Sequence, residues 1–240
     1  MGRRIRSRRR GKGGPAFKGT QFGLADAKYI SLDEKQQNNY ELGEVVDLLD
    51  DKARSCVLSK ILFDNGNYCF VPAAEGMRVG QLLQFGIEAE IGIGNVLPLK
   101  KIVEGCPVFN IEKSPGDGGA FVKSAGLYAL VMSKEKGKIL VKLPSGKIVF
   151  FNPDCRATIG CISAGGRMEK PMLKAGTKYH AMHAIHHHYP TVRGVAMNAC
   201  SHPHGGSQHH VGHSKSVSRN APPGRKVGAI ASSRTGRRKK

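Results

Sequence analysis

The sequence predicts a mainly β fold that contains two small barrels and carries long basic extensions at both ends. Short apolar runs rich in Val, Ile, Leu and Phe alternate with turn residues through the middle of the chain. No long amphipathic helix is evident in the pattern of apolar residues. Residues 1–30 and 200–240 are instead rich in Gly, Ser, Arg, Lys and Pro, with few apolar anchors. We therefore expect these ends to stay disordered until an anionic partner orders them.

The expected strands fall into two groups, each of which has the pattern of a meander. In the first group the strands are "GEVVDLL" (43–49), "CVLSKILF" (56–63) and, after the turn "DNGN", "YCFVP" (68–72). In the second they are "LYALVMS" (127–133), "KILVKL" (138–143) and "KIVFF" (147–151), with the turns "KEKGK" and "PSG" between them.

A separator, "NVLPLKKIVEGCP" (95–107), divides the two groups and places a boundary near residue 105. Antiparallel barrels of this size include the oligonucleotide-binding (OB) and SH3-like types. The predicted organisation has four parts: a basic N-terminal extension (1–39), a first barrel (40–105), a second barrel (106–180) and a basic, His- and Gly-rich C-terminal extension (181–240).

Charge is distributed very unevenly along the 240 residues. The formal net charge is +20, of which residues 1–40 carry +7, residues 41–160 carry none and residues 161–240 carry +13. Glu169 is the only carboxylate after Asp154. A surface that faces phosphates must lack carboxylates, so this distribution indicates a nucleic-acid partner. A membrane partner is not expected, since no signal sequence, apolar span or amphipathic anchor is evident.

All ten histidines lie between His180 and His213, and "NACSHPHGGSQHHVGH" (198–213) holds five of them with one cysteine. A metal site would need ligands at fixed spacing, and Cys200 stands alone beside two glycines. A catalytic histidine commonly needs an orienting carboxylate, and no nucleophile-elbow, P-loop or dinucleotide motif occurs. Histidine, arginine and asparagine can stack on bases and donate to phosphates, while glycine lets backbone approach RNA closely. RNA binding is the preferred interpretation of the three.

Six cysteines are present, none of them in a C-x-x-C pair, and most have apolar neighbours. This pattern is typical of buried free thiols in a reducing compartment. The glycine-rich stretch "SPGDGG" (114–119) resembles a phosphate cradle, but no G-K-[ST] follows it, so we interpret it as a turn.

Eight motifs in a fixed order resemble the universal second protein of the large ribosomal subunit, the ribosomal L-two family. They are "GNVLPL" (94–99), "SPGDGG" (114–119), "LPSG" (143–146), "CRATIG" (155–160), "KAG" (174–176), "VRGVAMN" (192–198), "HPHGG" (202–206) and "SRNAPPGRKVG" (218–228). The start "MGRRI" and the ending "SRTGRRKK" are similar to the archaeal and eukaryotic branch of that family.

The resemblance implies an OB-fold-type barrel followed by an SH3-like barrel, and a cytoplasmic protein of the ribosome without cofactors or metals. It implies a structural role: binding large-subunit rRNA, supporting subunit association and supporting the peptidyl-transferase region. The implied partners are large-subunit rRNA, other ribosomal proteins and the small subunit across the intersubunit interface.

The resemblance carries family RNA contacts onto Arg54 in "KARS" and Arg156 in "CRAT". The family histidine discussed in connection with peptide-bond formation falls on His202, where Ser201 replaces the Asp or Asn that often precedes it. No catalytic residue is expected; His202 is the weak candidate, and a Cys/His metal module is the other alternative. The residues expected to bind rRNA are Arg3, Arg4, Arg8, Arg9, Arg10, Arg54, Arg156, Arg167, Lys174, Arg193, Asn198, His202, His204, Gly205, Gly206, Arg219, Arg225 and Lys226.

Overall fold

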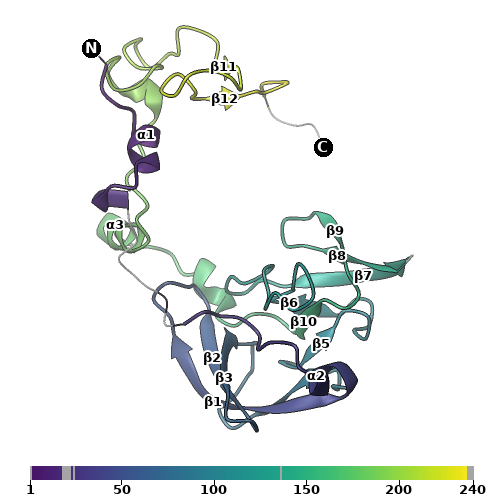
Figure 1. Ribbon diagram of the computed structural model, residues 1–240. Helices are drawn as coiled ribbons and strands as arrows, with labels where there is room; N and C mark the ends of the chain where they lie inside the picture. The colour runs from purple at the N-terminus through teal and green to yellow at the C-terminus, as the bar shows by residue number, and fades with distance from the viewer. Residues whose placement is uncertain (1, 18–22, 24, 136, 237–240) are drawn as a thin grey trace. The chain divides into compact units, whose positions relative to one another are not determined.

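A computed structural model describes residues 2–17, 23, 25–135 and 137–236. The chain divides into two compact units, which are treated separately (Figure 1). We call residues 22–171 the central unit, and residues 1–21 together with 172–240 the terminal unit.

The central unit is built on one ten-stranded sheet with the order β3-β2-β1-β4-β5-β10-β6-β7-β8-β9. Its neighbouring strands are antiparallel except for the parallel pair β4–β5. A short helix, α2 (Glu34–Asn38), precedes β1, and a 3-10 turn, η2 (Gly165–Met168), follows β10. The strands are β1 (Tyr40–Asp50), β2 (Val57–Phe63), β3 (Tyr68–Pro72), β4 (Leu82–Gly86), β5 (Val96–Pro98), β6 (Pro107–Phe109), β7 (Ala129–Glu135), β8 (Lys138–Lys142), β9 (Ile148–Phe151) and β10 (Arg156–Ile159).

The mainly β fold class is confirmed, and the six strands expected from the two meanders correspond to β1, β2, β3, β7, β8 and β9. The segment over residues 95–107, which separates the two meanders in the sequence, contains two strands that were not expected: β5 and the first residue of β6. These strands are three residues long, too short to show a period of two in the sequence. Strand β10 pairs with both of them, at Thr158 to Val96 and Thr158 to Phe109.

Two apolar clusters fill the central unit. The first surrounds Leu58, Ile61 and the edge-to-face ring pair Phe63–Phe85, whose centroids lie 5.0 Å apart. The second surrounds Leu97, Val131, Val141, Ala157 and their neighbours. Phe109 and Ile162, which follow the expected boundary in sequence, pack in the first cluster. The boundary at residue 105 and the OB and SH3-like types of the barrels stay predictions.

The terminal unit has little regular structure and almost no interior. Its elements are α1 (Arg6–Gly11), η1 (Pro15–Phe17), α3 (Ala175–Ala184), η3 (Gly194–Ala196) and the parallel pair β11 (Ser216–Val217) and β12 (Ala229–Ile230). Among its residues that the structure describes, only Ile5 and His204 are buried. Helix α3, the longest of the helices described, buries none of its residues. None of the described helices has the length and apolar character needed to span a bilayer.

Candidate nucleic-acid interface

The division into two units coincides with a complete division of charge. Residues 1–21 and 172–240 hold twenty Lys and Arg and no Asp or Glu, whereas residues 22–171 hold eighteen basic and eighteen acidic residues. The whole formal net charge of +20 therefore belongs to the terminal unit. A segment with this composition repels itself and attracts polyanions.

Within the terminal unit, the N-terminal extension lies against part of the C-terminal extension. The backbone N–H of Arg3 donates to the carbonyl of Cys200 at 2.7 Å. Ile5, the one apolar residue in "GRRIRSRRR", is buried and lines a hollow together with Val192 and His202. The N-terminal and C-terminal extensions were expected as separate parts, since no local sequence pattern reports a contact between residues so far apart.

One groove of the terminal unit collects four arginines beside a polar loop. Arg3, Arg4 and Arg9, all expected to bind rRNA, line it with Asn198. Arg6 also lines it and is missing from the predicted set, although it stands in the same basic run. Guanidinium groups bind phosphate oxygens in a planar fork, and an Asn amide can read a base edge or a sugar hydroxyl. The groove thus has the chemistry of a phosphate-backbone site.

Tight self-packing shapes residues 197–206, which we call the His202 loop. The N–H of Gly205 donates to the carbonyl of His202 at 3.0 Å, and that of Gly206 to the carbonyl of Met197 at 3.2 Å. A Cβ on Gly205 would lie less than 3.0 Å from the Met197 carbonyl oxygen, an overlap that backbone cannot relieve. Gly205 and Gly206 were expected to let RNA come close to the backbone. In the structure, the space beside Gly205 is taken by the backbone of Met197 and Asn198.

Gly194, which was not among the predicted site residues, supports the side chain of His202. A Cβ on Gly194 would overlap Cε1 of His202, so the imidazole rests directly on that backbone. The motif "VRGVAMN" contains Gly194, yet nothing in the sequence alone indicates which side chain would cover it.

His202 and His204 form a ring pair with defined protonation. Nδ1 of His202 accepts the backbone N–H of His204 at 3.0 Å, which places the proton of the neutral ring on Nε2. The His204 ring lies edge-on to those of His202 and His213, at centroid distances of 5.0 and 5.5 Å. Burial lowers the pKa of His202 below 6.5. The pKa of His204 is also lowered, mainly by burial and to a smaller extent by the charges of His202, His213 and Lys215. These shifts favour the neutral form of both rings.

The other predicted residues of the terminal unit are exposed side chains distributed over its surface. They are Arg8, Arg10, Lys174, Arg193, Arg219, Arg225 and Lys226. Arg193 shares a hollow with His204, and Lys226 shares one with His202. Arg167 lies in η2 of the central unit, where it is exposed.

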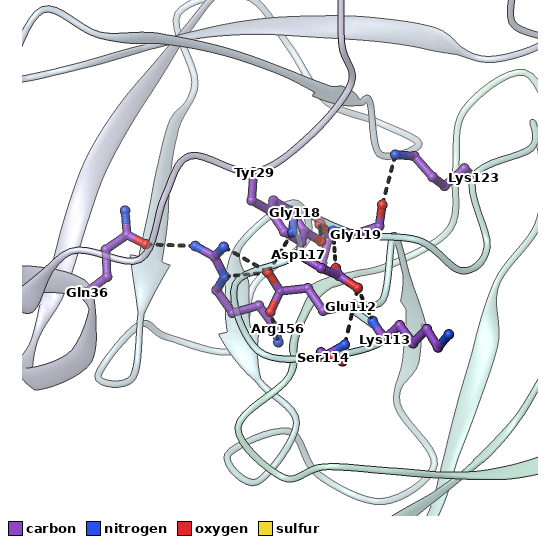
Figure 2. A network of polar contacts seen from close by, with 11 residues as sticks. Tyr29, Gln36, Glu112, Lys113, Ser114, Asp117, Gly118, Gly119, Lys123 and Arg156 are labelled. Atoms are coloured by element: carbon purple, nitrogen blue, oxygen red, sulfur yellow. Dashed lines mark hydrogen bonds and ion pairs between the residues drawn. The ribbon is translucent and has the colours of Figure 1, made fainter.

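Arg54 and Arg156 belong to the central unit and have carboxylate partners there. Arg54 pairs with the buried Asp51 and keeps 28% of its side-chain surface exposed. Arg156 is only 4% exposed and pairs with the fully buried Glu112 (Figure 2). Its Nη1 donates to Gln36 Oε1 at 3.0 Å. Direct rRNA contact by either arginine stays a prediction.

The "SPGDGG" loop forms a turn, as expected, and carboxylates accept several backbone N–H groups in and beside it (Figure 2). The N–H of Gly118 donates to Glu112 Oε1 at 3.1 Å, while those of Lys113, Ser114 and Gly119 donate to the Asp117 carboxylate at 2.8, 3.2 and 2.9 Å. Burial opposes ionisation of Asp117, but the three N–H donors together outweigh it and lower the pKa of that carboxyl. These N–H groups already have carboxylate acceptors, which disfavours a phosphate cradle.

Side chains suited to metal binding do not converge in the part of the chain described here: no group of three His, Cys, Asp or Glu could hold an ion. His180 and His183 lie on α3, whereas His187 follows the end of that helix. All six cysteines are free thiols, with Cys56, Cys69 and Cys155 buried, Cys106 and Cys161 partly buried and Cys200 exposed.

A neutral β unit joined to an acid-free basic unit with almost no interior is the organisation expected of a protein that assembles with RNA. A family model described as "Ribosomal Proteins L2, C-terminal domain" matches residues 92–226. The "Large ribosomal subunit protein uL2" of Methanococcus maripaludis strain C5 is 51% identical over 240 residues, covering 99% of this chain and 100% of the relative. The protein of the same name from the SB strain of Methanococcus vannielii is 50% identical with the same coverage.

The chain belongs to the L2 family of ribosomal proteins. It is a structural protein of the large ribosomal subunit, and its location is the cytoplasmic ribosome. Association with rRNA and other ribosomal proteins follows from that membership. The resemblance stated from the sequence motifs is therefore confirmed.

Proposed function

We propose that the terminal unit is the main rRNA-binding part of this protein and that rRNA takes the place of its missing interior. One observation carries the proposal: all of the net charge lies in the unit that buries only Ile5 and His204 among its described residues. Such a unit gains too little from apolar burial to offset the entropy of ordering. Phosphates neutralise its self-repulsion and supply the surface against which it packs.

In this proposal, exposed residues contact rRNA directly and the buried Arg156 acts indirectly. The arginines of the groove and the exposed basic residues of the terminal unit bind phosphates, with Asn198 beside them for a sugar or base. Arg54 adds a contact from the central unit through its exposed surface. Arg156 acts mainly by holding the loop that starts at Glu112, because its guanidinium hydrogen bonds go to Glu112 and Gln36.

The salt dependence of binding to large-subunit rRNA tests the proposal. The double variant Arg3→Gln/Arg4→Gln should reduce the slope of log K against log salt by about 0.7–0.9 for each phosphate that is no longer neutralised. The matched control, Lys35→Gln/Lys52→Gln, removes two exposed charges from the central unit and should leave the slope unchanged. Equal effects of the two double variants would show that binding depends on total charge, and the proposal would then be abandoned.

We further propose that the His202 loop supports the peptidyl-transferase region and subunit association by its shape, without proton transfer. The Nδ1 atom of His202 is used by a backbone N–H, and the terminal unit contains no carboxylate to orient the ring as a base. The contrary candidate, direct participation of His202 in peptidyl transfer, is tested by the His202→Gln variant described in the Discussion.

A further inference from the structure

The outward face of the ribbon formed by β7, β8 and β9 is apolar although it lies on the surface of the central unit. Across this ribbon Leu130 stands opposite Lys142, which stands opposite Ile148. In the next row Leu140 stands opposite Ser133 and Phe150. Directly opposed residues of antiparallel strands point to the same face, so both rows lie together.

Exposure confirms that this face has no cover within the described part of the central unit. Phe150 is 61% exposed, Ile148 is 55% exposed and Met132, at the bulge of β7, is 45% exposed. The alternate residues Val131, Val141 and Phe151 are buried in the second apolar cluster. The strands are thus apolar on both faces, whereas a solvated antiparallel face is usually polar.

Strand β9 also ends the sheet, and its hydrogen-bond register leaves backbone groups directed away from it. The N–H of Leu143 donates to the carbonyl of Lys147 at 2.9 Å, which makes that pair a hydrogen-bonded one. Hydrogen-bonded and non-hydrogen-bonded pairs alternate in an antiparallel ladder. The N–H and C=O groups of Ile148 and Phe150 therefore point away from β8, toward the open edge.

The charge of this region suits an acidic partner. Residues 136–153 contain four lysines and no Asp or Glu, although the central unit as a whole has balanced charge. Lys142 stands in the middle of the apolar row, and Lys138 lies two residues before Leu140 on the same strand face. The face also contains one carboxylate, that of Glu135, opposite Lys138 at the end of the hairpin.

We infer that this ribbon is a docking surface for an extended segment of another protein, which adds a strand beside β9. Main-chain hydrogen bonds to Ile148 and Phe150 would give affinity, apolar side chains at alternate positions would cover the exposed rows, and acidic side chains would meet Lys142 and its neighbours. A protein segment fits better than RNA because the face is mostly aliphatic and its edge offers backbone donors and acceptors. RNA sites instead favour aromatic platforms and exclude carboxylates.

Photo-crosslinking within assembled large subunits tests the inference. Phe150 is replaced by a photoreactive benzoyl-phenylalanine, and Tyr68, 52% exposed on the opposite edge strand β3, receives the same probe as the control. The expected product at position 150 is a polypeptide adduct, removed by protease and resistant to nuclease, whose mapped sites alternate along an extended acidic segment of another chain. An RNA adduct, an adduct within this chain, no adduct, or the same product from position 68 would each overturn the inference.

A substitution at the edge separates strand addition from simple apolar contact. Ile148→Pro removes one outward N–H and should lower the yield of the adduct from position 150 by about 2- to 10-fold, the value of one hydrogen bond. Lys142→Glu keeps the backbone intact and should lower the yield because its carboxylate repels the acidic partner. This variant replaces the proline variant in the test if the latter does not fold. An unchanged yield in folded variants of both kinds would reject the paired, acidic strand.

Discussion

The guanidinium of Arg156 donates two hydrogen bonds to Oε1 of Glu112, from Nε at 3.1 Å and from Nη2 at 2.8 Å. The backbone N–H of Arg156 donates to the other oxygen, Oε2, at 2.8 Å. The Glu112 side chain is completely buried. The same carboxylate accepts the N–H of Gly118, so one ion pair fixes β10 to the loop that follows β6 (Figure 2).

Removing the arginine should leave an unpaired buried charge. We expect Arg156→Met to lower the free energy of unfolding of the whole chain by about 3–5 kcal/mol, measured by urea denaturation. The double variant Arg156→Met/Glu112→Gln removes both charges and should recover part of that stability. A single variant within about 0.5 kcal/mol of the wild type would mean that water reaches Glu112 and the pair is dispensable.

Asp117 makes the stability of the loop depend on pH. Since the pKa of the folded carboxyl lies below its ordinary value of 3.8, its stabilising effect is full above that value and is lost as pH falls through the lower folded pKa. Asp117→Asn should therefore be less stable than the wild type near neutral pH, and the gap should close in acid. Urea denaturation at several pH values measures it; a gap that widens toward low pH would contradict the assignment.

A side chain at Gly205 should prevent the His202 loop from forming. The atoms that a Cβ would meet are the carbonyl oxygens of Met197 and Asn198, both less than 3.0 Å away. We expect Gly205→Ala to reduce incorporation into large subunits severalfold, and Gly205→Val to reduce it further. Gly176→Ala is the matched control, because nothing lies within 4 Å of the Cβ position there. Equal incorporation of the two alanine variants would show that the loop rearranges without cost.

His202→Gln should retain most of the function of the loop. The glutamine oxygen can accept the N–H of His204 in place of Nδ1, and the amide cannot act as a base at neutral pH. We expect single-turnover peptide transfer in fully assembled particles to change less than about tenfold, below the effect of a missing general base. A loss of the ~10²–10⁴-fold typical of a missing general base, with normal assembly, would instead assign His202 to catalysis.

Limited proteolysis of the free chain should separate the two units. Both apolar clusters lie in residues 22–171, whereas Ile5 and His204 are the buried residues among those described in the terminal unit. We expect a resistant fragment close to residues 22–171 and rapid cleavage of the remainder, with protection restored by large-subunit rRNA. Equal resistance along the whole free chain would mean that the terminal unit is stable without a partner.

The sequence predicted six of the strands because alternating or continuous apolar residues mark them, as "CVLSKILF" marks β2. It did not predict β4, β5, β6 or β10. Strands β5 and β6 have three residues each, and both pair with β10, which lies far along the chain. Charge distribution predicted the basic character of both ends but not their contact, since the bond between Arg3 and Cys200 depends on chain folding. The sequence also could not identify the buried partner of Arg156, because Glu112 lies 44 positions earlier and is one acidic residue among many.

The bond from Arg3 to Cys200 has a consequence for biosynthesis. The N-terminal arginines are translated first, but the carbonyl that receives the Arg3 N–H is made 197 residues later. At about 5–20 residues per second, these residues wait roughly 10–40 s for their partner, while the central unit is completed between them. Throughout that interval the N-terminal arginines lack the backbone that they pack against in the finished protein, so this part of the terminal unit forms only near the end of synthesis.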